Sequence, residues 1–197
     1  LVALPQTNVK RLLAYSGIAH SGYMLLGVAA MSPFGVAMVL FYLVAYAAVN
    51  LGAFGAIAAL SRDGREPLAP RDLAGLADRR PALAAALTVF LVSLTGIPIT
   101  AGFVGKFYLF RAAVSVGSMG IALALVGVVM SVVSAYYYLR VVVAMYMSEP
   151  EGEDAWGSVS PASAFALAVS AALTLLLGVW PAPLLALARI AARSLVQ

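Results

Sequence analysis

One lysine, Lys106, lies inside an apolar segment that runs from Pro81 to about Ser118. If this segment crosses a bilayer, Lys106 is about ten residues, or ~15 Å, from its outer end and therefore close to the midplane. An ammonium group at that depth costs several kcal/mol unless it is deprotonated, paired or hydrated. Because desolvation favours the neutral amine, such a lysine can take up and release a proton. The residue therefore predicts a proton-handling site.

Two other polar side chains are expected at a similar depth. His20 is about ten residues, again ~15 Å, beyond Lys10 at the inner end of the first apolar segment, and Asn50 lies inside the second segment. Both also have a structural interpretation, because a histidine in a helix bundle is often only hydrogen-bonded and an asparagine can hold helices together. No Asp or Glu occurs inside any apolar segment. A counter-charge for Lys106 would have to come from elsewhere.

The segment that carries Lys106 is also interrupted. Its 38 residues would form roughly 57 Å of straight helix, nearly twice a ~30 Å hydrocarbon core. Pro98 removes a backbone donor, and Gly96 and Gly102 loosen the chain on either side. Thr95 and Thr100 are placed to bond the carbonyls left unpaired. Discontinuous helices at membrane depth mark ion or substrate pathways in transporters, although a bend of this kind can also serve packing alone.

The composition agrees with a membrane setting. The chain has 197 residues, of which 63% are hydrophobic and 10% charged, with 12 basic and 8 acidic side chains. A soluble domain has about 25% charged residues, so a soluble enzyme, a disordered tail and a nucleic-acid module are excluded. The absence of cysteine excludes a disulfide framework, a Cys-ligated iron–sulfur cluster and a thiolate zinc site. We predict neither a metal site nor a bound cofactor in this chain.

The apolar segments predict one all-α membrane domain over residues 1–197, with five transmembrane helices of which the third is discontinuous. Leu1–Leu4 looks like the end of an earlier helix, so we expect a C-terminal portion of a longer protein. Arg189 and Arg193 share one face of a final segment, which predicts an amphipathic interfacial helix. The predicted helices are about 12–31, 35–61, 81–118 (broken near 96–102), 119–147 and 161–180, followed by the amphipathic tail 184–196.

The basic residues predict the orientation, because Lys and Arg concentrate on the cytoplasmic side. The loop 62–80 carries five arginines, and alternation of the spans puts Lys10, Arg11 and Arg140 on the same side. We therefore expect this loop to be cytoplasmic. Tyr136–Tyr138, beside Arg140, are expected in the interfacial aromatic belt of the inner surface.

Several sequence blocks resemble a known group of proteins. Asn8–Ser16 followed by Ile18–Tyr23, and Gly96–Pro98 followed by Gly102–Tyr108, are similar to the antiporter-like subunits of respiratory complex I. Within that group the chain is most similar to the subunit N family, the bacterial counterpart of mitochondrial NADH dehydrogenase subunit 2. The blocks that carry this closer similarity are Leu51–Gly55, Tyr136–Arg140 and Leu177–Pro181.

The resemblance implies an antiporter-like fold of about fourteen transmembrane helices with two inverted five-helix repeats, each holding one interrupted helix. Lys106 matches the ionisable residue of the second broken helix, which serves the outlet half-channel. Subunits L and M carry a histidine where this chain has Tyr46 and Asn50, which leaves His20 and Lys10 as candidates for the inner relay.

The function implied is that of a proton-translocating membrane subunit of NADH:quinone oxidoreductase, a translocase of the bacterial inner membrane. Its partners would be the neighbouring antiporter-like subunits, and NADH, FMN, iron–sulfur clusters and quinone would bind elsewhere in the complex. Two alternatives stay open. One is a subunit of a multisubunit cation/proton antiporter or a hydrogenase-linked ion pump. The other is a structural membrane subunit in which Lys106 is paired and silent.

Overall fold

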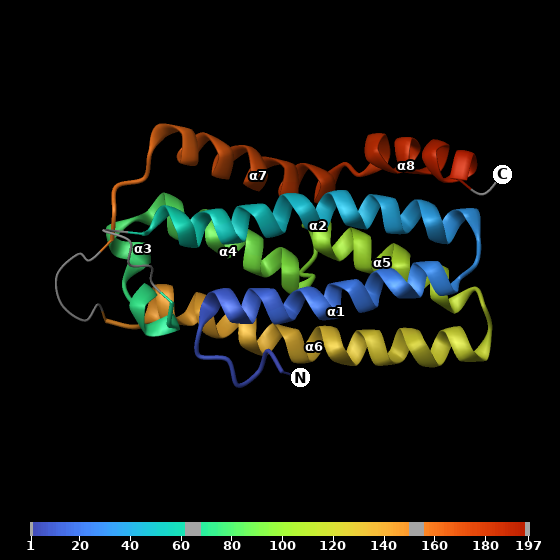
Figure 1. The fold of residues 1–197 in the computed structure, drawn as a ribbon, viewed down its shortest axis with the longest axis horizontal. Helices are drawn as coiled ribbons and strands as arrows, with labels where there is room; N and C mark the ends of the chain where they lie inside the picture. The colour runs from blue at the N-terminus through green and yellow to red at the C-terminus, as the bar shows by residue number, and fades with distance from the viewer. Residues whose placement is uncertain (1, 62–67, 150–155, 196–197) are drawn as a thin grey trace.

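The computed structural model describes residues 2–61, 68–149 and 156–195, and the secondary structure of these residues is helical throughout. The long helices lie side by side along the longest axis of the molecule (Figure 1). The elements are α1 (Val9–Ala29), α2 (Pro33–Ala59), the 3-10 helix η1 (Pro70–Leu73), α3 (Leu76–Arg79), α4 (Pro81–Thr95), α5 (Ala101–Val114), α6 (Ser118–Met147), α7 (Pro161–Val179) and α8 (Ala182–Leu195).

Of the described helices, α1, α2, α6 and α7 are each long and apolar enough to cross a bilayer, whereas α4 and α5 are shorter. Many large apolar side chains on these helices point outward, among them Leu25, Leu125, Val132 and Phe165. A water-soluble monomer rarely exposes apolar patches of this extent, so the surface suits lipid or other membrane helices.

Side-chain caps determine where three of the long helices begin. The Asn8 side chain accepts a hydrogen bond from the Arg11 amide at 3.0 Å, so α1 begins at Val9, earlier than the predicted start near residue 12. Ser32 caps α2, and Ser160 caps α7. In both helices the next residue is a proline at the first helical position, where its missing N–H costs nothing. The second helix therefore begins at Pro33 and not near residue 35.

The helix α2 forms the centre of the bundle and packs against α1, α4, α5, α7 and α8. Two groups of buried side chains surround it. One group joins α1, α2, α4 and α6 and includes Leu12, Phe90 and Tyr138. The other joins α2, α5 and α8 and includes Phe41 and Leu109. The α4–α5 connection therefore lies between two packed regions.

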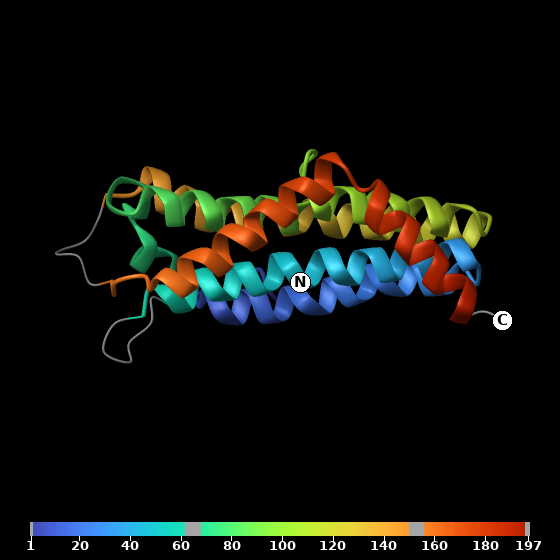
Figure 2. The ribbon, with the colours of Figure 1, turned by 90° about the horizontal axis from the view of Figure 1, so that it is seen from above.

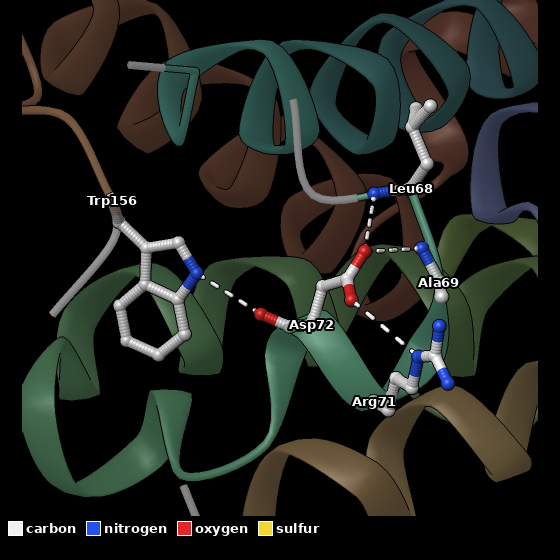
Figure 3. A network of polar contacts seen from close by, with 5 residues as sticks. All are labelled: Leu68, Ala69, Arg71, Asp72 and Trp156. Atoms are coloured by element: carbon white, nitrogen blue, oxygen red, sulfur yellow. Dashed lines mark hydrogen bonds and ion pairs between the residues drawn. The ribbon is translucent and has the colours of Figure 1, made fainter. Parts of the chain in front are cut away.

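Polar contacts hold the short elements at one end of the bundle (Figure 3). The Asp72 carboxylate accepts hydrogen bonds from the amides of Leu68 (3.0 Å) and Ala69 (2.8 Å). The Trp156 indole N–H donates to the Asp72 carbonyl at 3.0 Å. The Leu68 carbonyl in turn accepts from the Val9 amide at 2.6 Å. These bonds connect the segment before α7, the loop after α2 and the start of α1. Arg62, Arg65 and the other residues of 62–67, and the acidic residues within 150–155, lie outside the described residues.

Replacing Asp72 by alanine is expected to lower the free energy of unfolding by about 1–2 kcal/mol, because two amide donors lose a charged acceptor. The matched variant Arg71→Ala removes only an exposed ion pair of 3.9 Å and should cost about 0.5 kcal/mol or less. Thermal unfolding of the two full-length variants in the same lipid or detergent makes the comparison. Equal effects would contradict this role of Asp72.

Candidate functional site

The helix α4 ends in a glycine cap that leaves two carbonyls without amide partners from the next turn. Gly96 has φ 92°, in the left-handed region that suits glycine. Its amide donates to the Ser93 carbonyl at 3.0 Å, and the amide of Ile97 donates to that of Val92 at 3.2 Å. The chain then turns away from the helix axis, which leaves the carbonyls of Leu94 and Thr95 free to accept bonds from elsewhere.

The connection through Pro98 returns the chain to a second helix that abuts the first. Gly102, in the first turn of α5, donates its amide to the Ser93 hydroxyl at 3.1 Å, and a Cβ atom at this position would lie 1.9 Å from the Ser93 carbonyl oxygen. Ile99 has φ 75°, which is strained for a β-branched residue. Its carbonyl packs against Gly178 at the end of α7, and Figure 2 shows the connection beside the junction of α7 and α8.

Lys106 reaches back from α5 to the end of α4. Its side chain is 3% exposed. Its Nζ donates to the carbonyls of Leu94 (2.7 Å) and Thr95 (2.9 Å) and to the hydroxyl of Ser131 on α6 (3.0 Å). The Nζ also lies 4.9 Å from the centre of the Tyr23 ring. The lysine is therefore bound by uncharged oxygens at the carbonyl end of a helix, which carries a partial negative charge.

His20 occupies a second buried position, on α1. Its Nδ1 lies 2.6 Å from the Tyr42 hydroxyl and its Nε2 lies 3.1 Å from the Tyr138 hydroxyl. A neutral imidazole has one donor and one acceptor nitrogen, so one tyrosine donates to the ring and the other accepts from it. The ring also stacks on Tyr46, with 4.7 Å between ring centres. The histidine is thus fixed on both sides by side chains from α2 and α6.

A small cavity lies between the histidine and the end of α4. It is lined by His20 and Tyr42 on one side and by Ser93, Leu94 and Gly102 on the other, and its volume is about 10 Å³. That volume is close to the lower limit for a single water molecule. His20 and Leu94 therefore line the same cavity. The Leu94 carbonyl in turn accepts a hydrogen bond from Lys106.

The other two candidates are not among the residues that line this cavity. Lys10 is half-buried in the first turn of α1, about 15 Å along the helix from His20. Asn50 is half-buried on α2, and its Oδ1 is buried without a hydrogen-bond partner among the described residues. No group of three or more His, Cys, Asp or Glu residues that could hold a metal ion occurs in the part of the chain that the structure describes.

The sequence did not identify Ser131, Tyr42 or Tyr138 as site residues, and the expectation of an interfacial position was wrong for Tyr137 and Tyr138, which are both buried. Tyr138 is fully buried and bonded to His20, whereas Tyr136 is 64% exposed. Side chains two positions apart in a helix point about 200° apart around its axis. Tyr136 and Tyr138 therefore cannot both face out of the bundle. The available signal in the sequence was the spacing of Ser131, Ser134 and Tyr138 at three and four residues, which places these polar side chains on one face of a helix.

The structure is a helical bundle that contains membrane-length apolar helices, and a buried lysine lies at the junction of two half-length helices. These features define the class of protein. It is a multi-pass membrane protein. The family whose model is described as NADH:quinone oxidoreductase/Mrp antiporter, TM, matches residues 1–134, and the chain belongs to this family. This finding confirms the resemblance drawn from the sequence.

Within the family, the chain is similar over most of its length to proteins named subunit N. The chain is 48% identical over 187 residues to NADH-quinone oxidoreductase subunit N of Trichlorobacter lovleyi, a match that covers 95% of this chain and 38% of that protein. It is 48% identical over 180 residues to subunit N 1 of Solibacter usitatus, covering 91% of this chain and 37% of the relative. The chain thus spans less than half the length of these curated relatives.

Two solved structures share the fold. A chain of respiratory complex I from Thermus thermophilus with bound aureothin superposes with a TM-score of 0.81 at 35% identity, over 94% of this chain and 41% of that one. A chain of the Mrp complex from Dietzia sp. superposes with a TM-score of 0.86 at 28% identity, over 99% and 44% of the two chains. The fold is therefore shared with chains from two kinds of complex.

Proposed function

We propose that this chain is part of a proton-translocating membrane subunit of NADH:quinone oxidoreductase that corresponds to subunit N. The observation that carries the proposal is Lys106, buried at the α4–α5 junction and held by three uncharged oxygens. The 48% identity to proteins named subunit N supports the choice of complex.

Lys106 is the proton-carrying group in this proposal. A buried lysine locked to a carboxylate would resist deprotonation, because losing the proton would leave an unpaired buried charge. The partners of Lys106 are carbonyls and a hydroxyl, which stabilise the ammonium without carrying a full charge. Both protonation states are therefore accessible, which is what a group that passes protons requires.

His20 supplies the proton in this proposal. His20 and Leu94 line one cavity of about 10 Å³, close to the lower limit for a single water molecule, and we propose that a proton passes from the imidazole towards Lys106 through this region. Lys10 would admit protons at the inner end of α1 and Asn50 would support the polar route. The backbone freedom of Gly96, Pro98 and Gly102 would let the junction open to water on the outer side.

We further propose that α4 and α5 together make one discontinuous membrane crossing, which gives five crossings in residues 1–197 as a single membrane domain. The two helices, of 15 and 14 residues, make about 44 Å of helix, which suits the ~40–45 Å thickness of a bilayer with its interfacial regions. In the whole protein, residues 1–197 would hold most of the second of two inverted five-helix repeats, with its first helix represented only by Leu1–Leu4, in the fold of about fourteen helices. The loop 62–80 would face the cytoplasm of a bacterium, with the protein in the inner membrane.

The exposure of the α4–α5 connection supports the proposal that other membrane subunits contact this chain. Ile97 is 39% exposed and Ile99 is 67% exposed, yet irregular backbone at membrane depth does not face lipid, because its polar groups would be unsatisfied. Another protein surface should therefore cover it. We propose neighbouring antiporter-like subunits of the complex as the partners, with NADH, FMN, iron–sulfur clusters and quinone bound by other subunits and none by this chain.

The structural likeness to the Mrp complex supports one alternative, a subunit of a cation/proton antiporter. The full-length protein, tagged and purified from its native membrane, is expected to bring NADH:quinone oxidoreductase activity with it. Inverted vesicles should then show NADH-driven acidification whose rate does not depend on sodium. Sodium-dependent transport without NADH oxidation would instead support the antiporter.

A further inference from the structure

The Ser131 hydroxyl has two different partners at the candidate site. It lies half-buried on α6 and accepts a hydrogen bond from Lys106 Nζ at 3.0 Å. It also donates to the Thr95 carbonyl at 3.1 Å. The same hydroxyl therefore connects the lysine to the end of α4, although it belongs to a third helix.

The hydrogen-bonding capacity of Lys106 changes when it loses a proton. A protonated amine has three donors, and the three oxygens around Nζ, those of Leu94, Thr95 and Ser131, accept from it. The neutral amine has two hydrogens and one lone pair, which needs a donor. A carbonyl cannot donate, so of these three groups Ser131 is the one that can.

We propose that Ser131 is a positioning residue that binds Lys106 in both protonation states, an inference that rests on the proposed function. With the charged amine, the hydroxyl accepts from Nζ and donates to the Thr95 carbonyl. With the neutral amine, rotation about the Cβ–Oγ bond turns the hydroxyl hydrogen from Thr95 to the Nζ lone pair. The two N–H groups that remain keep their bonds to Leu94 and Thr95. The proton itself passes to the next group of the pathway, and no other covalent bond changes.

Other titratable groups face Lys106 without taking this role. From α1, Tyr23 presents its ring to Nζ. Its buried hydroxyl approaches the hydroxyls of Ser131 and Ser134 without meeting hydrogen-bond geometry to any described residue. His20, also on α1, is bound to Tyr42 of α2 and Tyr138 of α6. The helices α4 and α7 contain no titratable side chain. Among the described residues, Ser131 is thus the side chain whose hydroxyl bonds Nζ.

The test compares Ser131→Ala with Ser131→Thr in the full-length protein of the assembled complex. We expect Ser131→Ala to pump protons about fivefold to tenfold more slowly per assembled complex and to have a changed pH for half-maximal pumping. Ser131→Thr keeps the hydroxyl and should restore both the rate and the pH profile. Ser134→Ala is the matched control on the same helix, because the Ser134 hydroxyl donates to the backbone carbonyl of Ser131 at 2.6 Å and not to the lysine.

A normal rate and pH profile in Ser131→Ala would overturn the inference, as would equal impairment in Ser131→Thr, which would indicate packing alone. If Ser131→Ala does not assemble, Ser131→Cys is compared with Ser131→Thr on the same two readouts, because a thiol is similar in size and a weak donor. The proposed function fails separately, if the Lys106→Ala complex pumps normally. An inactive Lys106→Ala complex beside a normal Ser131→Ala complex would refute the Ser131 inference alone.

Discussion

Replacing Lys106 by alanine is expected to reduce NADH-driven proton transport by about tenfold or more, while the complex still assembles. In the proposed function, this variant removes the proton-carrying group of the α4–α5 junction. The residues left around it, the carbonyls of Leu94 and Thr95 and the Ser131 hydroxyl, accept or share hydrogen bonds but cannot carry a proton at neutral pH. Acidification of inverted vesicles, measured with a pH-sensitive dye, gives the rate.

Two comparisons separate chemistry from packing. Lys106→Met keeps most of the side-chain volume and should lose transport as fully as alanine does. Electron transfer from NADH to a water-soluble artificial acceptor, which bypasses the membrane part, reports how much complex is present. Normal proton transport per assembled complex in either variant would contradict the role of Lys106.

Replacing Gly102 by alanine is expected to have the largest effect on assembly. A Cβ atom at this position would lie 1.9 Å from the Ser93 carbonyl oxygen and 2.8 Å from its carbon. These are backbone atoms at the end of a packed helix, so α4 and α5 would have to separate. Overpacking of this kind costs about 1–3 kcal/mol and sometimes more. The displacement would also move the carbonyls that bind Lys106.

The amount of assembled complex in membranes carrying Gly102→Ala, determined by native electrophoresis, should fall several-fold, and transport in the remainder should be impaired. Gly55→Ala is the matched control within a helix, because its Cβ would meet only the end of the Leu167 side chain at 3.4 Å. Equal amounts of complex in the two variants would show that the close approach at Gly102 is not needed.

The sequence predicted the part of the site that local rules govern. Gly96 and Pro98 interrupt a helix wherever they occur together, and a lysine deep in an apolar segment is unusual whatever surrounds it. The sequence therefore predicted the helix break near Gly96 and a buried position for Lys106, whose role in proton transfer stays a prediction. Pro33 was harder to interpret, because a proline after a serine can end one helix or begin the next, and the cap on Ser32 favours the second.

The contacts between helices could not be predicted in the same way. Ser131 and Tyr138 are ordinary residues in an apolar helix, and their roles arise because α6 packs beside both α1 and α4. Ile99 is another case, since no local rule places an isoleucine at positive φ. Its conformation follows from the short distance between the two half-length helices and from the close packing of Gly178. Such features depend on tertiary packing, which one sequence does not specify.

The most direct test of proton transfer through Lys106 is the number of protons pumped per NADH oxidised by the assembled Lys106→Arg complex. Arginine keeps the positive charge and most of the length but does not deprotonate in proteins. If Lys106 works by releasing its proton, the ratio should fall as far as it does in Lys106→Ala. An unchanged ratio in Lys106→Arg would show that the site needs only a charge and would contradict proton transfer through this lysine.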